Sequence, residues 1–199
     1  MKDIIKITLN LVIICGLAGI ILSSTWAVTD PVKVKAEARE LEESLKALVP
    51  TADSIKEVKK VTIEGKEGAI YKAVSGGRTV GYVVQSWGKG YSSFIKMLVA
   101  VDPEMKVTGI DILSHGETPG LGDQITTPWF KGQFKGKGID NLVVVRGETD
   151  KDIQAISGAT ISSRGVTKGV KEAVETLQKE VQAGTLTPGP SPIEGRGEK

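Results

Sequence analysis

Segment 157–162, Ser-Gly-Ala-Thr-Ile-Ser, places small and hydroxyl residues at the entry to a helical pattern. A loop that runs into a helix N-terminus presents free backbone N–H groups and the positive end of the helix dipole. It therefore favours a bound anion, most often a phosphate. Gly158 and Ala159 leave room for a bulky group at the backbone, and Thr160 offers a hydroxyl where the phosphate would lie. On spacing alone an ordinary helix cap is the simpler interpretation, with Ser162 as the better placed capping residue.

A second polar segment, 115–122, reads His-Gly-Glu-Thr-Pro-Gly-Leu-Gly and opens a Gly/Thr/Pro-rich stretch that extends to Thr127. The stretch has the composition of a turn but is too long for a simple connection, which indicates a functional loop. A lone histidine in a polar loop is usually solvated, however, and Thr-Pro-Gly is a common turn. The residues alone therefore favour a structural role for this loop.

The composition excludes several other kinds of chemistry. The 199 residues include one histidine and one cysteine, so the chain holds no intrachain disulfide, no cysteine-only metal cluster and no histidine-rich metal centre. The formal net charge of +2 gives no basic face of the kind that binds nucleic acid. Chemistry in this protein must come from a bound cofactor or from carboxylates and hydroxyls.

The chain begins with an apolar segment. Residues 7–28 contain no charged side chain and would span about 33 Å as a helix, enough for the hydrocarbon core of a bilayer. Trp26 falls where an interfacial aromatic residue belongs. We predict a single-pass anchor over 1–29 that places the rest of the chain on the extracytoplasmic side of the cell (inner) membrane. A cleaved signal peptide is the alternative, but the apolar run is longer than usual for one.

The remaining chain predicts an α+β domain with a mainly antiparallel sheet and flanking helices. An amphipathic stalk or packing helix covers 30–50, the domain itself covers 51–183, and residues 184–199 have the composition of a disordered tail. The expected strands are 69–75, 79–87, 94–102, 106–114 and a short buried strand over 142–146, followed by a helix over about 162–182.

Both polar segments resemble motifs of the FMN-binding domain. Ser-Gly-Ala-Thr, followed by a hydrophobic residue and Ser, resembles the flavinylation motif of this family, and segment 115–122 is similar to its second signature. Gly90-Tyr91 leading into 94–102 also looks like the family's stretch before its central turn. The domain is shared by the G subunit of the Rnf complex and the C subunit of the sodium-pumping NADH:quinone oxidoreductase. The resemblance extends over about residues 4–182.

The resemblance implies that a flavin transferase attaches FMN covalently, through its phosphate, to Thr160. The other cofactor-binding residues that it implies are Ser157, Gly158, Ala159 and Ser162 near the phosphate, and Glu117, Thr118 and Leu121 beside the flavin ring. The sequence departs from the family at one position, because Gln154 stands where an aspartate is common and Asp152 lies two residues earlier.

The function implied by the resemblance is electron transfer by a membrane-anchored FMN subunit of an ion-translocating Rnf-type ferredoxin:NAD oxidoreductase. The subunit would act as a relay and would not be catalytic alone. Its partners would be the integral-membrane and redox subunits of the complex and the flavin transferase, with no nucleic acid and no metal. The alternatives are a counterpart of the C subunit in a sodium-pumping quinone reductase, a non-redox sensor or scaffold, and a structural domain with an unmodified Thr160.

Overall fold

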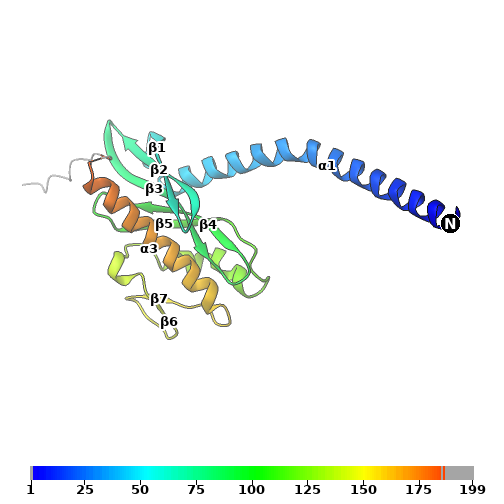
Figure 1. Ribbon diagram of the computed structural model, residues 1–199. Coiled ribbons are helices and arrows are strands. Elements are labelled where there is room, and N and C mark those ends of the chain that lie inside the picture. The colour runs from blue at the N-terminus through cyan, green and yellow to red at the C-terminus, as the bar shows by residue number, and fades with distance from the viewer. Residues whose placement is uncertain (1, 185, 187–199) are drawn as a thin grey trace, which may run out of the picture. The chain divides into compact units, whose positions relative to one another are not determined.

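The computed structural model describes residues 2–184 and 186, and its chain divides into two compact units, Met1–Glu42 and Glu43–Lys199 (Figure 1). The first unit is formed by helix α1, Lys2–Leu48, whose last residues belong to the second unit. The helix runs through position 31, where the sequence predicts the start of a separate helix. A single proline removes one backbone hydrogen bond and does not need to end a helix that is otherwise favourable.

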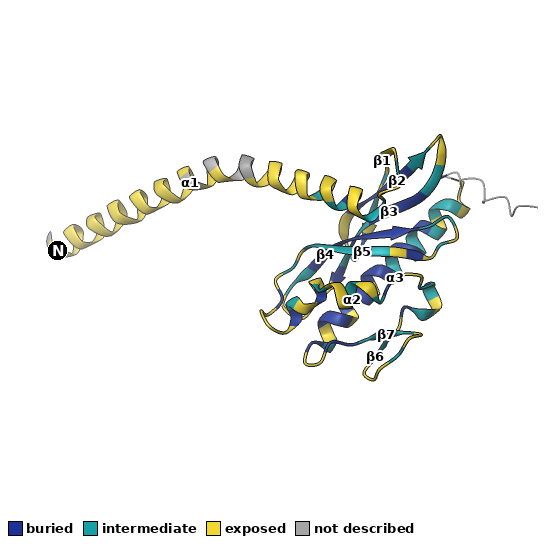
Figure 2. Ribbon diagram, turned by 180° about the vertical axis from the view of Figure 1, so that it is seen from behind, coloured by how far each residue is buried: buried dark blue, intermediate teal, exposed yellow. Residues whose placement is uncertain are grey.

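Segment Asp3–Ser24 of α1 is long and apolar enough to cross a membrane, and none of it is buried within the protein (Figure 2). Two of its hydroxyl groups are satisfied inside the helix, because Thr8 donates to the Ile4 carbonyl at 2.9 Å and Ser24 donates to the Ile20 carbonyl at 2.7 Å. Such internal bonding is what an apolar solvent requires of polar groups.

The second unit is built on a five-stranded antiparallel sheet in the order β1-β2-β3-β4-β5, which confirms the expected fold class. The strands are β1 Ser54–Ile63, β2 Lys66–Ser75, β3 Arg78–Lys89, β4 Phe94–Val101 and β5 Val107–Ser114. The predicted hairpins are present, and Gly76 and Gly77 make the β2–β3 turn with positive φ angles of 57° and 77°. Strand β1 is an addition to the predicted set.

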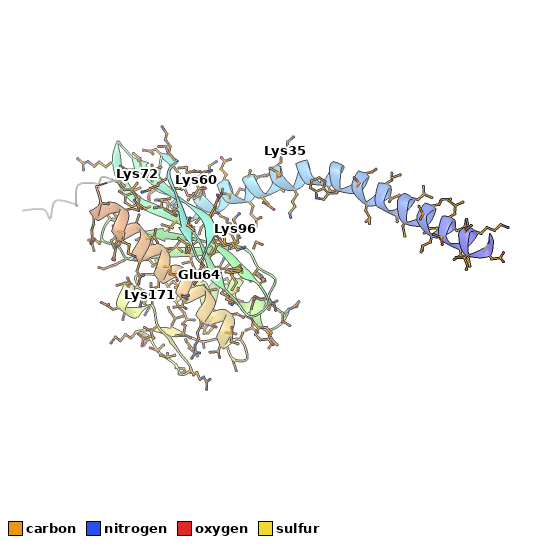
Figure 3. The ribbon with its side chains drawn as sticks, viewed as in Figure 1. Lys35, Lys60, Glu64, Lys72, Lys96 and Lys171 are labelled. Atoms are coloured by element: carbon orange, nitrogen blue, oxygen red, sulfur yellow. The ribbon has the colours of Figure 1, made fainter. Side chains whose placement is uncertain are left out.

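Helix α3, Thr160–Gln182, packs on one face of the sheet (Figures 1 and 2). Its stripe of buried valines meets the inward side chains of β3 and β4, which forms the hydrophobic core. Glu64, in the β1–β2 turn and labelled in Figure 3, pairs with Lys168 of α3. Leu186 after the helix is 4% exposed, and the predicted tail otherwise lies outside the described residues apart from Gly184.

The chain between β5 and α3 contains short elements only. They are η1 Gly122–Thr126, α2 Pro128–Gly132, η2 Ile139–Asn141, β6 Val144–Val145 and β7 Ile153–Gln154. The predicted buried strand over 142–146 is reduced to β6, which is half-buried and pairs in parallel with β7. Lys131 of α2 binds the Asp111 carboxylate at 2.9 Å, so this segment is held to the edge strand β5.

Candidate functional site

The site is centred on the first turn of α3, which begins at Thr160. Among the described residues no side chain caps this helix, and its N-cap residue is Ala159, with φ −128° and ψ 39°. The expectation that Ser162 caps the helix is therefore wrong. Its hydroxyl donates instead to the Glu117 carboxylate, because the serine lies on the side of the helix that faces the 115–122 loop. The first N–H groups of α3 are left available to an anion.

Ser163 fixes the backbone that enters the helix. Its hydroxyl donates to the Ala159 carbonyl at 3.0 Å and accepts from the Ile156 N–H at 3.0 Å. Gly158 adopts a positive φ of 78°, a conformation that favours glycine. Segment 157–162 is thus a defined turn in which Thr160 is half-buried.

Glu117 is the most heavily hydrogen-bonded side chain of the site. It is 5% exposed, and each of its carboxylate oxygens accepts two hydrogen bonds. The donors are the backbone N–H groups of Tyr91 and Ser92 at 3.0 Å, that of Ser93 at 3.3 Å, and the Ser162 hydroxyl. The carboxylate therefore joins three separate segments of the chain.

These donors keep Glu117 ionised. Burial by itself raises the pKa of this carboxyl, but the hydrogen bonds from Ser162 and from the N–H groups of residues 91–93 outweigh it. The pKa of Glu117 therefore lies below the ordinary glutamate value. A negative charge is present beside segment 157–162 at neutral pH.

We predict that Glu117→Gln lowers the free energy of unfolding by about 2 kcal/mol at neutral pH, because hydrogen bonds to a charged group are lost. The pKa of Glu117 is lower in the folded state, so its contribution is full above the unfolded-state pKa of about 4.3 and is lost as pH falls through the folded-state pKa. Urea unfolding between about pH 7 and pH 3 should show the two proteins converging in acid. A difference that stays constant over this range would contradict the prediction.

Two hollows of about 440 Å³ each meet at Thr160. The first hollow is lined by Tyr91, Glu117, Thr118, Leu121, Gly122, Gly158, Ala159, Thr160, Ile161 and Ser162. The second hollow is lined by Gln124, Trp129, Arg146, Gln154, Ala155, Ile156, Ser157, Gly158 and Thr160. Thr160 thus lines both hollows.

Seven of the eight cofactor-binding residues predicted from the sequence line the first hollow, and Ser157 lines the second. The structure adds Tyr91 and Ile161, which are 70% and 52% exposed, to the rim of the first hollow beside Leu121, which is 47% exposed. Apolar side chains this exposed are suited to cover a planar aromatic ligand. The segment before β4 thus takes part in the site.

Gln154, the departure from the family pattern, lies on the wall of the second hollow, which Arg146 also lines. Its backbone is held by the Gln133 side chain, which accepts from the Gln154 N–H at 2.7 Å and donates to the Gln154 carbonyl at 3.3 Å. The backbone that leads into segment 157–162 is therefore held at Gln154 by the side chain of Gln133, which follows α2.

Comparison with known proteins shows which family the chain is similar to. Residues 90–175 match the FMN-binding domain family. The chain is 44% identical over 177 residues to the G subunit of the proton-translocating ferredoxin:NAD(+) oxidoreductase complex of Clostridium ljungdahlii, covering 88% of this chain and 92% of the relative. It is 34% identical over 193 residues to the G subunit of the Na(+)-translocating ferredoxin:NAD(+) oxidoreductase complex of Acetobacterium woodii, covering 89% and 93%.

A solved structure shares the fold. The crystal structure of NqrC from Shewanella oneidensis aligns with a TM-score of 0.50 and 27% identity, covering 67% of this chain and 72% of that chain. The resemblance to the FMN-binding domain, first suggested by the two motifs, is thereby confirmed.

Proposed function

Because the chain belongs to the G-subunit family of ion-translocating oxidoreductase complexes and contains an FMN-binding domain, we propose that it carries FMN on Thr160 and relays electrons within such a complex. The chain is 44% identical to the Clostridium ljungdahlii G subunit and 27% identical to Shewanella oneidensis NqrC, and this difference favours a ferredoxin:NAD oxidoreductase over the quinone reductase alternative. The protein is a subunit of the redox assembly and not an enzyme by itself.

The observation that carries the proposal is the place of Thr160. This residue begins a helix that no described side chain caps, and it lines a hollow of about 440 Å³, within the usual range for ligand sites of about 300–1,000 Å³. A phosphodiester on the hydroxyl would lie where the helix N–H groups and dipole favour negative charge. Leu121, Tyr91 and Ile161 line the first hollow and would shield the flavin ring there.

The attachment requires a flavin nucleotide whose FMN phosphate is activated in a pyrophosphate bond. The Thr160 oxygen forms the new bond to phosphorus, the pyrophosphate P–O bond breaks, the second nucleotide leaves as its monophosphate, and the hydroxyl proton passes to a base or to water. We assign this reaction to a separate flavin transferase. Once bound, the flavin supplies one- and two-electron chemistry, while the protein supplies position, electrostatics and shielding.

We further propose that α1 anchors the subunit in the membrane through Asp3–Ser24 and that the FMN-binding domain lies on the extracytoplasmic side. An apolar helix followed by a large folded domain is typical of a signal anchor. A covalent bond would keep the flavin attached in a compartment from which free FMN diffuses away. The partners would be the integral-membrane and redox subunits of the complex.

The anchor leads to a prediction about solubility. We expect the full chain to require detergent and residues 30–199 alone to be soluble and folded, because the apolar segment is entirely exposed in the first unit. Fractionation of both forms, followed by mass spectrometry of the N-terminus, measures this. If expression of the full-length gene instead gives a soluble protein that lacks residues 1–27, the segment is a cleaved signal peptide.

The attached flavin is tested by denaturing electrophoresis of the protein after co-expression with a flavin transferase. We expect a band that fluoresces under ultraviolet light and an intact mass raised by roughly 440 Da, the mass that a phosphoester-linked FMN adds. A colourless band with the mass of the unmodified chain would rule out the covalent function and favour a structural domain.

A further inference from the structure

We propose that Glu117 is a positioning residue for the attachment of FMN. Through Ser162, it holds the first turn of α3, and with it the Thr160 hydroxyl, against loop 90–93. This inference rests on the proposed function. In place of the direct flavin contact expected from the sequence, Glu117 acts on the attachment through Ser162.

The contacts of the carboxylate support this role. Oε1 accepts from the N–H groups of Ser92 and Ser93, and Oε2 accepts from the N–H group of Tyr91 and from the Ser162 hydroxyl. Each carboxylate oxygen thus accepts from two donors, and the carboxylate has about four acceptor sites in total. Its acceptor sites are therefore occupied by groups of the protein. Glu117 and Ser162 are both buried, at 5% and 2% exposure. A side chain with its acceptors occupied in this way is better suited to hold the site than to bind the ligand directly.

The neighbouring backbone is shaped around this side chain. A Cβ atom on Gly90 would lie 2.4 Å from Glu117 Oε1, and one on Gly122 would lie 2.8 Å from Glu117 Cβ and 2.9 Å from Ser162 Oγ. Only glycine at both positions allows the loop and the carboxylate to approach this closely. The arrangement therefore depends on residues from three motifs that are distant in sequence.

The chemical consequence concerns the acceptor hydroxyl. Ser162 lies in the same helical turn as Thr160, so the bond to Glu117 restricts the rotation and translation of that turn. A nucleophile held in near-attack geometry reacts faster, and a displacement of about 1 Å costs up to about 100-fold in rate. Glu117 also lines the first hollow, so its negative charge opposes the gain of an electron by a flavin bound there.

Two substitutions separate these effects. Glu117→Gln keeps the shape, but its amide nitrogen cannot accept the hydrogen bonds that one carboxylate oxygen accepts. Ser162→Ala removes the hydroxyl and leaves the carboxylate. Val174→Ala is the control. Val174 is fully buried in the same helix but lies outside both hollows, so its substitution lowers the free energy of unfolding without changing a residue of the site.

The experiment measures the rate of FMN attachment to the full chain in detergent, with purified flavin transferase and FAD, and then the midpoint potential of the attached flavin. We expect Glu117→Gln and Ser162→Ala to slow attachment by about 10-fold to 100-fold. The double variant should be no slower than Glu117→Gln alone, because both substitutions act on the same hydrogen bond between Ser162 and Glu117. Val174→Ala should react at the wild-type rate, and the potential of Glu117→Gln should shift in the positive direction.

The outcomes distinguish the inference from the proposed function. Wild-type rates of attachment in both site variants, with FMN attached to all proteins, would overturn the positioning role and leave the function intact. Equal slowing in Val174→Ala would also overturn it, since loss of stability would then explain the effect. Absence of FMN on the wild type would overturn the proposed function itself. Should Glu117→Gln fail to fold, the comparison of Ser162→Ala with Val174→Ala decides the matter.

Discussion

Thr160→Ala is expected to give a folded, membrane-bound and colourless protein. The substitution removes the hydroxyl that would form the phosphoester, so covalent FMN should be lost completely. The cost to the fold should be small, about 0.5 kcal/mol, because the Thr160 side chain does not cap α3 and is only half-buried. In the assembled complex, electron flow should stop while the subunits remain associated.

The measurements are fluorescence of the denatured band, intact mass, and thermal unfolding of the variant beside the wild type. Thr160→Ser is the matched variant. It keeps a hydroxyl at the same position and should therefore still carry covalent FMN. Ser157→Ala, which alters a hydroxyl on the second hollow only, should remain fluorescent. Detection of FMN on another residue of Thr160→Ala would show that the attachment site lies elsewhere.

The parts of the fold that the sequence predicts correctly are those with strong local signals. The Gly76-Gly77 turn between two alternating segments identifies the β2–β3 hairpin, because the positive φ angles suit glycine. The valine stripe that ends near Gln182 identifies α3 to within two residues at its start. In both cases the pattern depends on neighbours in sequence, so no knowledge of distant contacts is required.

Strand β1 could not be found in this way. It is one of the two edge strands of the sheet, and its pattern of apolar and polar residues is interrupted by Lys56, Lys59 and Lys60. Lys59 is accommodated because it pairs with Glu180 of α3, a contact between residues far apart in the chain. Lysines on an edge strand also discourage pairing with other chains, so the weak pattern has a physical reason.

The site shows the same limit. The motifs identify the residues around Thr160, but they do not reveal that Ser162 binds Glu117, which lies 45 residues earlier. A serine in the first turn of a helix is ordinarily a capping residue, and only the tertiary arrangement decides which acceptor it meets. Tyr91 enters the site for a similar reason, since its loop is brought to α3 by the sheet.

Gly165→Ala should cause a large loss of stability in this domain. A Cβ atom on Gly165 would lie 2.4 Å from the Lys89 carbonyl oxygen and 3.1 Å from the Gly90 nitrogen, both rigid backbone atoms. Four residues later, the Gly169 carbonyl accepts the Ser86 hydroxyl at 2.7 Å, so the helix cannot easily move away from β3. We expect the free energy of unfolding to fall by about 3 kcal/mol. The unfolding midpoint should fall by about 6–12 °C.

Gly132→Ala is the matched control for this effect. Gly132 ends α2, no atom of the described residues lies within 4 Å of its Cβ position, and its φ angle is not positive. Alanine is intrinsically the better helix former by about 1 kcal/mol, so this control should be neutral or slightly stabilising. The same intrinsic gain applies at Gly165, where the steric clash must exceed it for the protein to be destabilised. Equal midpoints for the two variants in thermal unfolding would show that α3 can shift on the sheet, whereas a large difference would show that this close contact holds the helix that carries Thr160.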